Sequence, residues 1–286
     1  MALYSTHAGK PKVKKIRNAI IFIALILFAL ATIFPIYFMF ISSLSDPVAV
    51  GEIEYSIIPK KFTLDSYKYF FNFNEHSVRW LLNSLIVAVT VMISNVLFAS
   101  MAGYAFSKIQ FKGRGFLFAL LLGSMMIPTQ VTLVPLYILM VNVFELQNTY
   151  SALILPSLVT VFNIFLAKQF MGSIPNEILE CAKIEGCNQF QIYGKIILPL
   201  SKTVMAVMAI LTFMESWNTF FWPLLVTNSM EMQTIQVGLK SFRFANTTMI
   251  APMMAGATIS ALPMFVLFFS LQRYFLEGVT VGAVKG

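Results

Sequence analysis

Groups that could take part in chemistry concentrate in one polar segment, residues 176–199, which lies between long apolar stretches. It holds three carboxylates and both cysteines of the chain, namely Glu177, Glu180, Glu185, Cys181 and Cys187. The five residues between the cysteines match no common metal motif, and the histidines, His7 and His76, are too few and too far apart for a metal site. The segment therefore has no catalytic or metal-binding pattern, and its structured course between apolar stretches suggests an elbow that could bind a partner.

The first half of this segment is predicted to be a short helix that ends at a glycine break. Pro175 suits the first turn of a helix, and Glu177 and Glu180 place negative charge near the positive end of the helix dipole. Gly186 then allows a backbone turn that is forbidden to most residues. On these grounds alone, an amphipathic hairpin on the membrane surface is as good an interpretation as an elbow that binds a partner.

The second half is predicted to be another short helix. Asn188 can cap it, because Gln191 stands three residues later in the capping-box position. Phe190, Tyr193 and Ile197 recur at helical spacing and are expected to form one apolar stripe, and Pro199 should prevent smooth continuation. Residues 176–199 are called the elbow below.

The composition is that of an integral membrane protein. Hydrophobic residues make up 58% of the 286 residues, charged residues 11%, and the mean hydropathy is +0.79, whereas a soluble domain carries roughly 25% charged residues. The net charge of +8 does not indicate nucleic-acid binding, because the basic residues are spread between the apolar stretches. The positive-inside rule explains them better.

Six stretches are long and apolar enough to cross a bilayer as helices, which takes about 20 residues each. They are residues 18–43, 81–106, 115–141, 150–171, 202–226 and 251–275. The predicted fold class is all-α, a polytopic membrane protein with six transmembrane helices that follow a basic N-terminal segment, residues 1–17. With the N-terminus inside, 14 of the 20 Lys and Arg residues fall on the inner side, which predicts that both termini are cytoplasmic.

Several details within these stretches carry further expectations. Prolines such as Pro128 in the third stretch and Pro223 near the end of the fifth predict kinks. Asn83 and Ser84 in the second stretch are expected to hydrogen-bond between helices. The outer segment, residues 44–80, contains an aromatic run that is predicted to lie at the membrane interface.

The chain has no recognisable ATP site. Its two Gly-Lys pairs, at residues 9–10 and 194–195, lack the preceding glycine and the following Ser or Thr of a phosphate-binding loop. We expect no cofactor and no metal in this chain, and any energy that its activity needs must come from another polypeptide or from an ion gradient.

Glu180-Cys181-Ala182 with Gly186, and the run Ile196-Ile197-Leu198-Pro199, resemble the EAA loop of ABC importer permeases. Cys181 replaces the first alanine of that pattern, and Glu185 replaces the usual aspartate before the glycine. Further segments resemble the carbohydrate-uptake branch, at residues 80–84, 104–108, 126–128, 217–218 and 278–286. Over residues 15–286 the chain resembles the second, six-span permease of a maltose-type importer, a binding-protein-dependent transport inner-membrane component.

The resemblance implies an ABC importer type I permease domain over residues 18–286, with a coupling loop at about residues 172–200. The residues expected to seat in a groove on an ATPase subunit are Glu177, Glu180, Cys181, Ala182, Glu185, Gly186, Phe190 and Pro199. It also implies a second homologous permease subunit, two ATP-binding cassette subunits that hold ATP and Mg²⁺, and an extracytoplasmic solute-binding protein. The implied location is the bacterial cytoplasmic (inner) membrane, and the implied role is sugar or oligosaccharide import rather than enzymatic catalysis.

A candidate substrate path follows from the one acidic residue deep within an apparent span, Glu215. A carboxylate is costly there unless it faces a cavity or a partner. Trp217, Asn218 and Phe221 follow, and aromatic faces stack on sugar rings while amides and carboxylates bind sugar hydroxyls. Alternatively, Glu215 lies near the outer end of its helix and anchors that helix at the interface.

A second class of protein fits the membrane composition, an autonomous secondary transporter or channel. That class favours paired intramembrane charges or repeated discontinuous helices. The sequence has only Glu215 in a span and no clear internal repeat, so the importer subunit is the preferred hypothesis.

Overall fold

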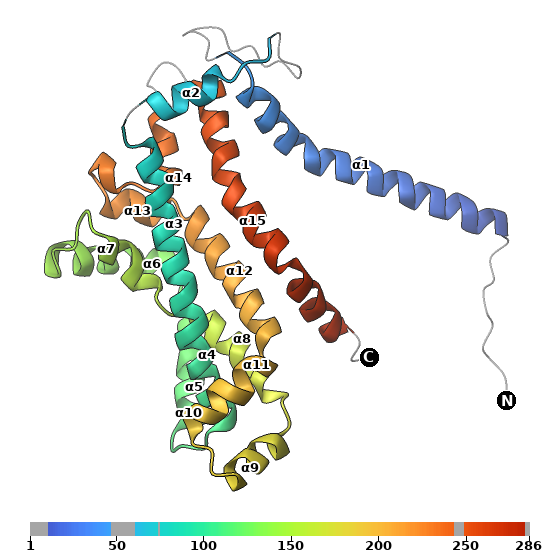
Figure 1. The fold of residues 1–286 in the computed structure, drawn as a ribbon, viewed down its shortest axis with the longest axis vertical. Helices are drawn as coiled ribbons and strands as arrows, with labels where there is room; N and C mark the ends of the chain where they lie inside the picture. Colours follow the sequence, from blue (N-terminus) through green and yellow to red (C-terminus); the bar gives the residue numbers. More distant parts are fainter. Residues whose placement is uncertain (1–10, 47–60, 74, 243–248, 284–286) are drawn as a thin grey trace. The chain divides into compact units, whose positions relative to one another are not determined.

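Every regular element that the structure describes is a helix (Figure 1). The computed structural model describes residues 11–46, 61–73, 75–242 and 249–283, and within them the all-α prediction is confirmed. The predicted segment 1–17 falls largely outside these ranges. So do residues 284–286 of the C-terminal motif and four basic residues used in the charge count, Lys10, Lys60, Arg243 and Lys285.

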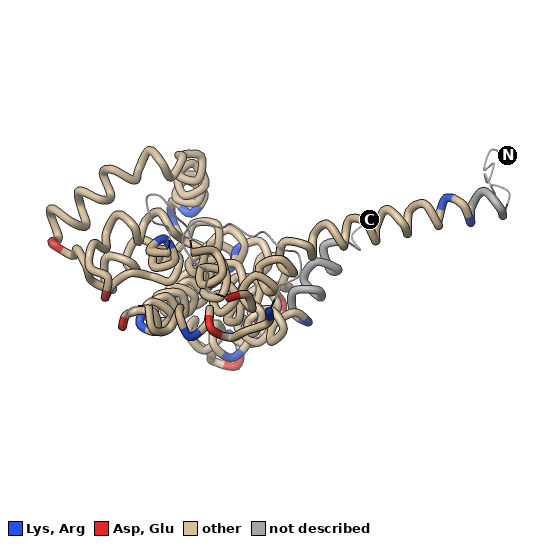
Figure 2. Tube along the Cα trace, turned by 90° about the horizontal axis from the view of Figure 1, so that it is seen from above, with Lys and Arg blue, Asp and Glu red and all other residues tan. Residues whose placement is uncertain are grey.

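The chain divides into two units, residues 1–70 with 244–258, and residues 71–243 with 259–286. In the first unit, α1 (Pro11–Ser43) runs unbroken through Pro35, and its described side chains are exposed along most of its length. Figure 2 shows basic residues only near the N-terminal end of its described part. The apolar run Lys15–Ser43 matches the first predicted span.

The chain after α1 is fixed by contacts with α2 (Asp65–Asn72). The hydroxyl oxygens of Ser43 and Tyr67 lie 2.7 Å apart, and the Ser66 hydroxyl donates to the Ser45 carbonyl at 2.6 Å. At the start of α2, hydrogen bonds from the Thr63 hydroxyl and the nearby Lys68 ammonium lower the pKa of the Asp65 carboxyl. The interfacial placement of the aromatic run remains a prediction.

In the second unit, the second span is continuous. It consists of α3 (Ser77–Ser94), a π-helical turn η1 (Asn95–Ala99) and α4 (Ser100–Lys108). α3 packs beside α12 (Lys202–Asn218), and α4 beside α8 (Val161–Gly172). The second pair is very close: a Cβ added at Gly103 would lie 2.5 Å from that of Ala167. Small residues at such positions let membrane helices approach each other.

The third stretch is bent far more sharply than a kink. α5 (Arg114–Ser124) is followed by α6 (Thr129–Tyr137) and the π-helical η2 (Ile138–Val143), and the two halves meet at 90°. The prediction of one helix over residues 115–141 is therefore wrong. The break falls at Pro128, which precedes α6 with an extended ψ of 132°, because a proline lacks the N–H of the helical ladder and its ring would clash with the carbonyl four residues earlier in a continuous helix.

The fourth and fifth stretches are bent as well. α7 (Tyr150–Ile154) and η3 (Leu155–Ser157) meet α8 at 41°. The helical segment Gln189–Leu200 meets α12 at 79°. α12 ends at Asn218, Thr219 is extended, and α13 (Phe221–Val226) is a separate helix, so the predicted helix over residues 202–226 is corrected. The break falls at Thr219, because the ring of Pro223 would clash with the carbonyl four residues before it in a continuous helix.

The remaining elements complete the second unit and the last span. A loop with η5 (Met230–Met232), α14 (Ile235–Gly238) and η6 (Leu239–Phe242) follows α13, and α15 (Ile250–Ala283) is the last helix. Among the described residues, three helices are long and apolar enough to cross a membrane, and three bent pairs pass the same test together. Counted with each pair as one span, they match the six predicted stretches in number and order.

A buried polar junction lies at the 41° bend. The Asn95 side chain donates to the Ser157 carbonyl at 2.7 Å and accepts from the backbone N–H of Thr160 at 2.8 Å. Its Oδ1 also accepts from Asn163 Nδ2, which donates in turn to Thr212 Oγ1 at 2.8 Å. The junction satisfies backbone groups that the bend would leave unpaired in an apolar interior, and so it holds the bend against the π-helical turn η1.

Candidate functional site

The elbow begins with α9 (Asn176–Ile184), which has two different faces. Leu179 and Ala182 are buried, while Glu177, Glu180 and Cys181 are exposed. Pro175 precedes the helix with an extended ψ of 139°, so it caps α9 instead of occupying its first turn as predicted. Its missing N–H costs nothing at that position.

The glycine break is confirmed. Gly186 has a φ of +83°, in the left-handed region, and its N–H donates to the Lys183 carbonyl at 3.0 Å. The N–H of Cys187 donates to the Ala182 carbonyl, also at 3.0 Å. These two bonds satisfy carbonyls at the end of α9, as left-handed glycines commonly do after helices.

The capping box that opens the second arm is also confirmed. Asn188 Oδ1 accepts from the Gln191 N–H at 2.9 Å, and Gln191 Oε1 accepts from the Asn188 N–H at 2.8 Å. α10 (Gln189–Ile192) begins there and leads into the π-helical η4 (Tyr193–Ile197) and α11 (Leu198–Leu200).

The predicted apolar stripe of the second arm is wrong in part. Tyr193 and Ile197 are buried, but Phe190 is 77% exposed. The buried face consists of Ile192, Tyr193 and Ile197. Phe190 therefore faces away from the helices that support the elbow.

Pro199 does not end the second arm. The helix continues through Leu200, and the bend of 79° falls at Ser201, whose N–H bonds to the carbonyls of Ile197 and Leu198. Pro199 lies in the first turn of α11, directly after the π-helical turn η4. In membrane helices, a local π turn can satisfy the carbonyl that a proline leaves without an N–H partner.

The elbow presents an exposed apolar surface around its turn. Ile184 is 87% exposed and Phe190 77%, and Ile178 is partly exposed as well. The carboxylates Glu180 and Glu185 stand beside them and are also exposed. Large apolar side chains at a polar tip commonly mark a protein interaction site, so the tip has the character of a docking surface.

The inner face of the elbow is part of the core of the second unit. Leu179, Ala182, Ile192 and Ile197 pack in one apolar cluster with residues of α4 and α8, including Tyr104 and Ala167. Figure 1 shows α9 and α10 at one end of this unit, with α13 and α14 toward the other. The elbow is thus seated on the spans.

The four residues of the candidate substrate path do not share one face. Glu215, Asn218 and Phe221 are exposed, whereas Trp217 is 2% exposed and its indole N–H donates to the Ser260 carbonyl at 3.0 Å. The Trp217 ring also stacks on Phe213. Within the described residues, no hydrogen bond or ion pair involves the Glu215 carboxylate.

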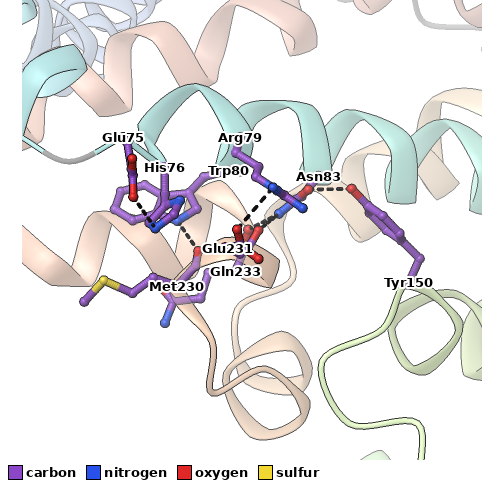
Figure 3. A network of polar contacts seen from close by, with 9 residues as sticks. All are labelled: Glu75, His76, Arg79, Trp80, Asn83, Tyr150, Met230, Glu231 and Gln233. Atoms are coloured by element: carbon purple, nitrogen blue, oxygen red, sulfur yellow. Dashed lines mark hydrogen bonds and ion pairs between the residues drawn. The ribbon is translucent and has the colours of Figure 1, made fainter.

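A polar network that the sequence did not reveal lies at the far end of α3 (Figure 3). The Trp80 indole donates to the Met230 carbonyl at 2.8 Å, and Asn83 Nδ2 donates to the carbonyls of Glu231 and Gln233 at 2.7 and 2.9 Å. The Tyr150 hydroxyl donates to Asn83 Oδ1 at 2.6 Å, which confirms the expected helix–helix bond for Asn83. The network holds the loop after α13 against α3.

Ser84 does not make the hydrogen bond between spans that was expected of it. Its hydroxyl accepts from the backbone N–H of Ile235 at 2.8 Å, so it binds the start of α14 and not a neighbouring span. Gly238 packs so closely on Trp80 that an added Cβ would lie 2.2 Å from the ring. Residues 80–84 therefore hold the loop after α13 in place. The sequence does not show this role, because the contacts join residues about 150 positions apart.

The fold is that of a polytopic helical membrane protein with a structured elbow at one end of its spans. Residues 95–281 match the family described as binding-protein-dependent transport system inner membrane component. The chain belongs to this family, and it is a transport permease subunit and not an enzyme.

Its relatives cover nearly the whole chain. It is 35% identical over 279 residues to the arabinooligosaccharides transport system permease protein AraQ of Halalkalibacterium halodurans, with 97% of this chain and 100% of the relative covered. It is 30% identical over 274 residues to the sn-glycerol-3-phosphate transport system permease protein UgpE of Brucella abortus, with 93% and 97% covered.

A solved structure shares the fold. It is a bacterial ABC transporter involved in the import of the acidic polysaccharide alginate, with a TM-score of 0.79 and 22% identity over 96% of this chain and 100% of that chain. The expected permease fold is confirmed by this likeness.

Proposed function

We propose that this chain forms half of the translocation path of an ATP-driven importer for sugars or oligosaccharides. Its relatives are named as permeases for arabinooligosaccharides and for sn-glycerol-3-phosphate. A structural neighbour belongs to an alginate importer. These cargoes are polyhydroxylated, which supports a sugar-like substrate and leaves the particular sugar open.

The elbow is the part that couples transport to ATP. The observation that carries this assignment is its two-sidedness: Leu179 and Ile197 are buried in the core of the spans, while Ile184 and Phe190 are exposed at the tip. Such a surface suits the groove of an ATP-binding cassette subunit, which would hold ATP and Mg²⁺. ATP then favours one of two arrangements of the spans through its different affinity for them.

The partners are a second homologous permease, two ATP-binding cassette subunits and an extracytoplasmic solute-binding protein. A neighbouring alginate transporter was solved in complex with a periplasmic protein that holds an alginate pentasaccharide. In this arrangement the elbow and both termini face the cytoplasm, in accord with the excess of basic residues assigned to that side. The membrane is the bacterial cytoplasmic membrane.

The substrate path runs along the exposed face that carries Glu215, Asn218 and Phe221. A carboxylate that has no partner among the described residues needs a polar cavity or a neighbouring chain at membrane depth. Glu215 and Asn218 can bind sugar hydroxyls, and Phe221 offers a stacking face. Trp217 supports this face from within, through its bond to Ser260.

Gentle solubilisation of native membranes, capture of the intact chain and mass spectrometry of its companions test this function. Recovery of a second permease and an ATPase with a phosphate-binding loop, with ATP-dependent sugar uptake after reconstitution, is the expected result. If the chain is recovered alone and moves sugar without ATP, it is an autonomous transporter and the proposal fails.

A further inference from the structure

One face of α4 carries three polar side chains directed at the elbow, Ser100, Tyr104 and Lys108. They are four residues apart, so they stand one above another on a helix. Each one contacts a different part of the segment from residue 172 to residue 193. The end of the second span and the elbow are therefore joined by polar contacts in addition to the apolar cluster.

Lys108 joins α4 to the first arm. Its ammonium donates to the Ile174 carbonyl at 2.5 Å, to Asn176 Oδ1 at 2.9 Å and to the Gly172 carbonyl at 3.3 Å. An ammonium has three donors, and these three acceptors use all of them. Gly172 is the last residue of α8 and Asn176 the first of α9, so one side chain fastens the chain between those two helices.

Ser100 and Tyr104 join α4 to the second arm. The Tyr104 hydroxyl donates to Gln189 Oε1 at 2.7 Å, and the hydroxyl oxygens of Ser100 and Tyr193 lie 2.7 Å apart. The rings of Tyr104 and Tyr193 are also in contact, with centroids 5.6 Å apart. This arm thus has two hydrogen bonds and an aromatic pair to α4.

The two arms of the elbow differ in the apolar contacts that would still hold them to the spans if a polar contact were lost. The second arm buries Ile192, Tyr193 and Ile197, whereas α9 buries only Leu179 and Ala182. The first arm depends more on Lys108, and hydrogen bonds to a charged group are stronger than neutral ones. The tip at Gly186 has nothing within 4 Å of the Cβ that a side chain there would carry, so a partner can reach it without moving the arms.

We propose that Lys108 is a positioning residue for coupling: it fixes the first arm of the elbow to the inner end of the second span, so that a displacement of the elbow moves α4. This inference rests on the proposed coupling role of the elbow. Without the ammonium, α9 moves on its apolar contacts alone, and part of each ATP-driven displacement no longer reaches the span.

The test compares Lys108→Met, Lys108→Gln and Lys108→Arg in the complete complex recovered from membranes and reconstituted in vesicles. Methionine keeps an apolar stem and loses all three donors, whereas arginine keeps the charge and donors. The matched control is Lys112→Met, because Lys112 is an exposed lysine four residues further along the chain. Two quantities are measured for each variant: the sugar taken up per ATP hydrolysed, and the hydrogen–deuterium exchange of the backbone amides of residues 176–184.

The expected result is a fall in sugar moved per ATP for Lys108→Met, since losing a hydrogen bond to a charged group raises the ratio of detached to attached arm about tenfold or more. Exchange in α9 rises in parallel, Lys108→Arg restores both, and Lys112→Met changes neither. If Lys108→Met fails to assemble, Lys108→Gln provides the same comparison.

Two outcomes overturn the inference while leaving the importer function intact. One is normal uptake per ATP in Lys108→Met or Lys108→Gln when the wild-type complex imports sugar. The other is reduced uptake with unchanged exchange in α9. A wild-type complex without ATP-dependent uptake instead contradicts the proposed function, and the exchange measurement on the same samples still shows whether Lys108 holds the arm.

Discussion

Substitution of Gly186 tests the backbone geometry of the elbow turn without disturbing any side-chain contact. Nothing lies within 4 Å of an added Cβ, so a new side chain meets no steric obstacle. The cost comes entirely from the φ of +83°. An L-residue in the left-handed region costs about 1–2 kcal/mol, and asparagine is among the few residues that visit the region routinely. A β-branched residue is the least suited to it.

These values predict a graded effect on coupling. Because about 1.4 kcal/mol corresponds to a factor of ten in an equilibrium constant, Gly186→Val should reduce the ratio of native to non-native turn about tenfold or more. Gly186→Ala should reduce it less, and Gly186→Asn least. Sugar uptake per ATP should fall in the order Asn, Ala, Val, while the amount of complex in the membrane stays constant because the site is exposed.

The assay is ATP-dependent sugar uptake by the reconstituted complex, with ATP hydrolysis measured on the same vesicles. Gly194→Val is the matched control, since Gly194 is also in the elbow and has open space but no positive φ. Equal coupling for Gly186→Val and Gly186→Asn would refute the reasoning, because it would show that the left-handed turn does not govern transmission.

Three further predictions concern the path and the packing of the spans. Glu215→Gln should raise the KM for uptake by roughly tenfold or more, because a hydrogen bond to a charged group contributes about 1.5–3 kcal/mol. Unchanged uptake kinetics would favour the anchoring role instead. Asn95→Ala should lower the melting temperature of the purified complex more than Asn163→Ala, because Asn95, unlike Asn163, satisfies backbone groups of the bend, at Ser157 and Thr160; equal shifts would contradict this. Gly103→Val should prevent accumulation of the complex, because its Cβ would lie 2.5 Å from that of Ala167 and 2.8 Å from the Lys168 backbone, whereas Gly115→Val, in open space, should be tolerated.

The sequence predicts best what is encoded locally. Gly186 and the Asn188–Gln191 pair lie within a few residues of the groups they serve, and the structure bears them out. The six apolar stretches are recognisable because hydrocarbon demands long apolar runs. The right-angle break at Pro128 was not predicted, since a proline in a membrane helix produces anything from no bend to a complete break, according to its neighbours. Pro35 causes no break in α1.

The candidate site was harder to predict for a related reason. In a soluble helix the polar face marks the surface, but lipid-facing and core-facing sides of a span are both apolar. The sequence therefore could not indicate that Trp217 faces inward while Glu215 and Phe221 are exposed. The contacts of Lys108 with residues 172–176 are also hidden, because they join positions more than 60 residues apart.

The right-angle segment formed by α5 and α6 bears on the steady-state amount of this protein in the cell. No side chain of either helix is fully buried, and Met126, at the break between them, is 85% exposed. Irregular backbone at membrane depth persists only where protein or water covers it. In the complex proposed above, a second subunit would enclose this segment, so a newly made copy would be unfinished until it assembles. We expect surplus copies to be cleared by membrane proteases, which would tie the abundance of this chain to the supply of its partner.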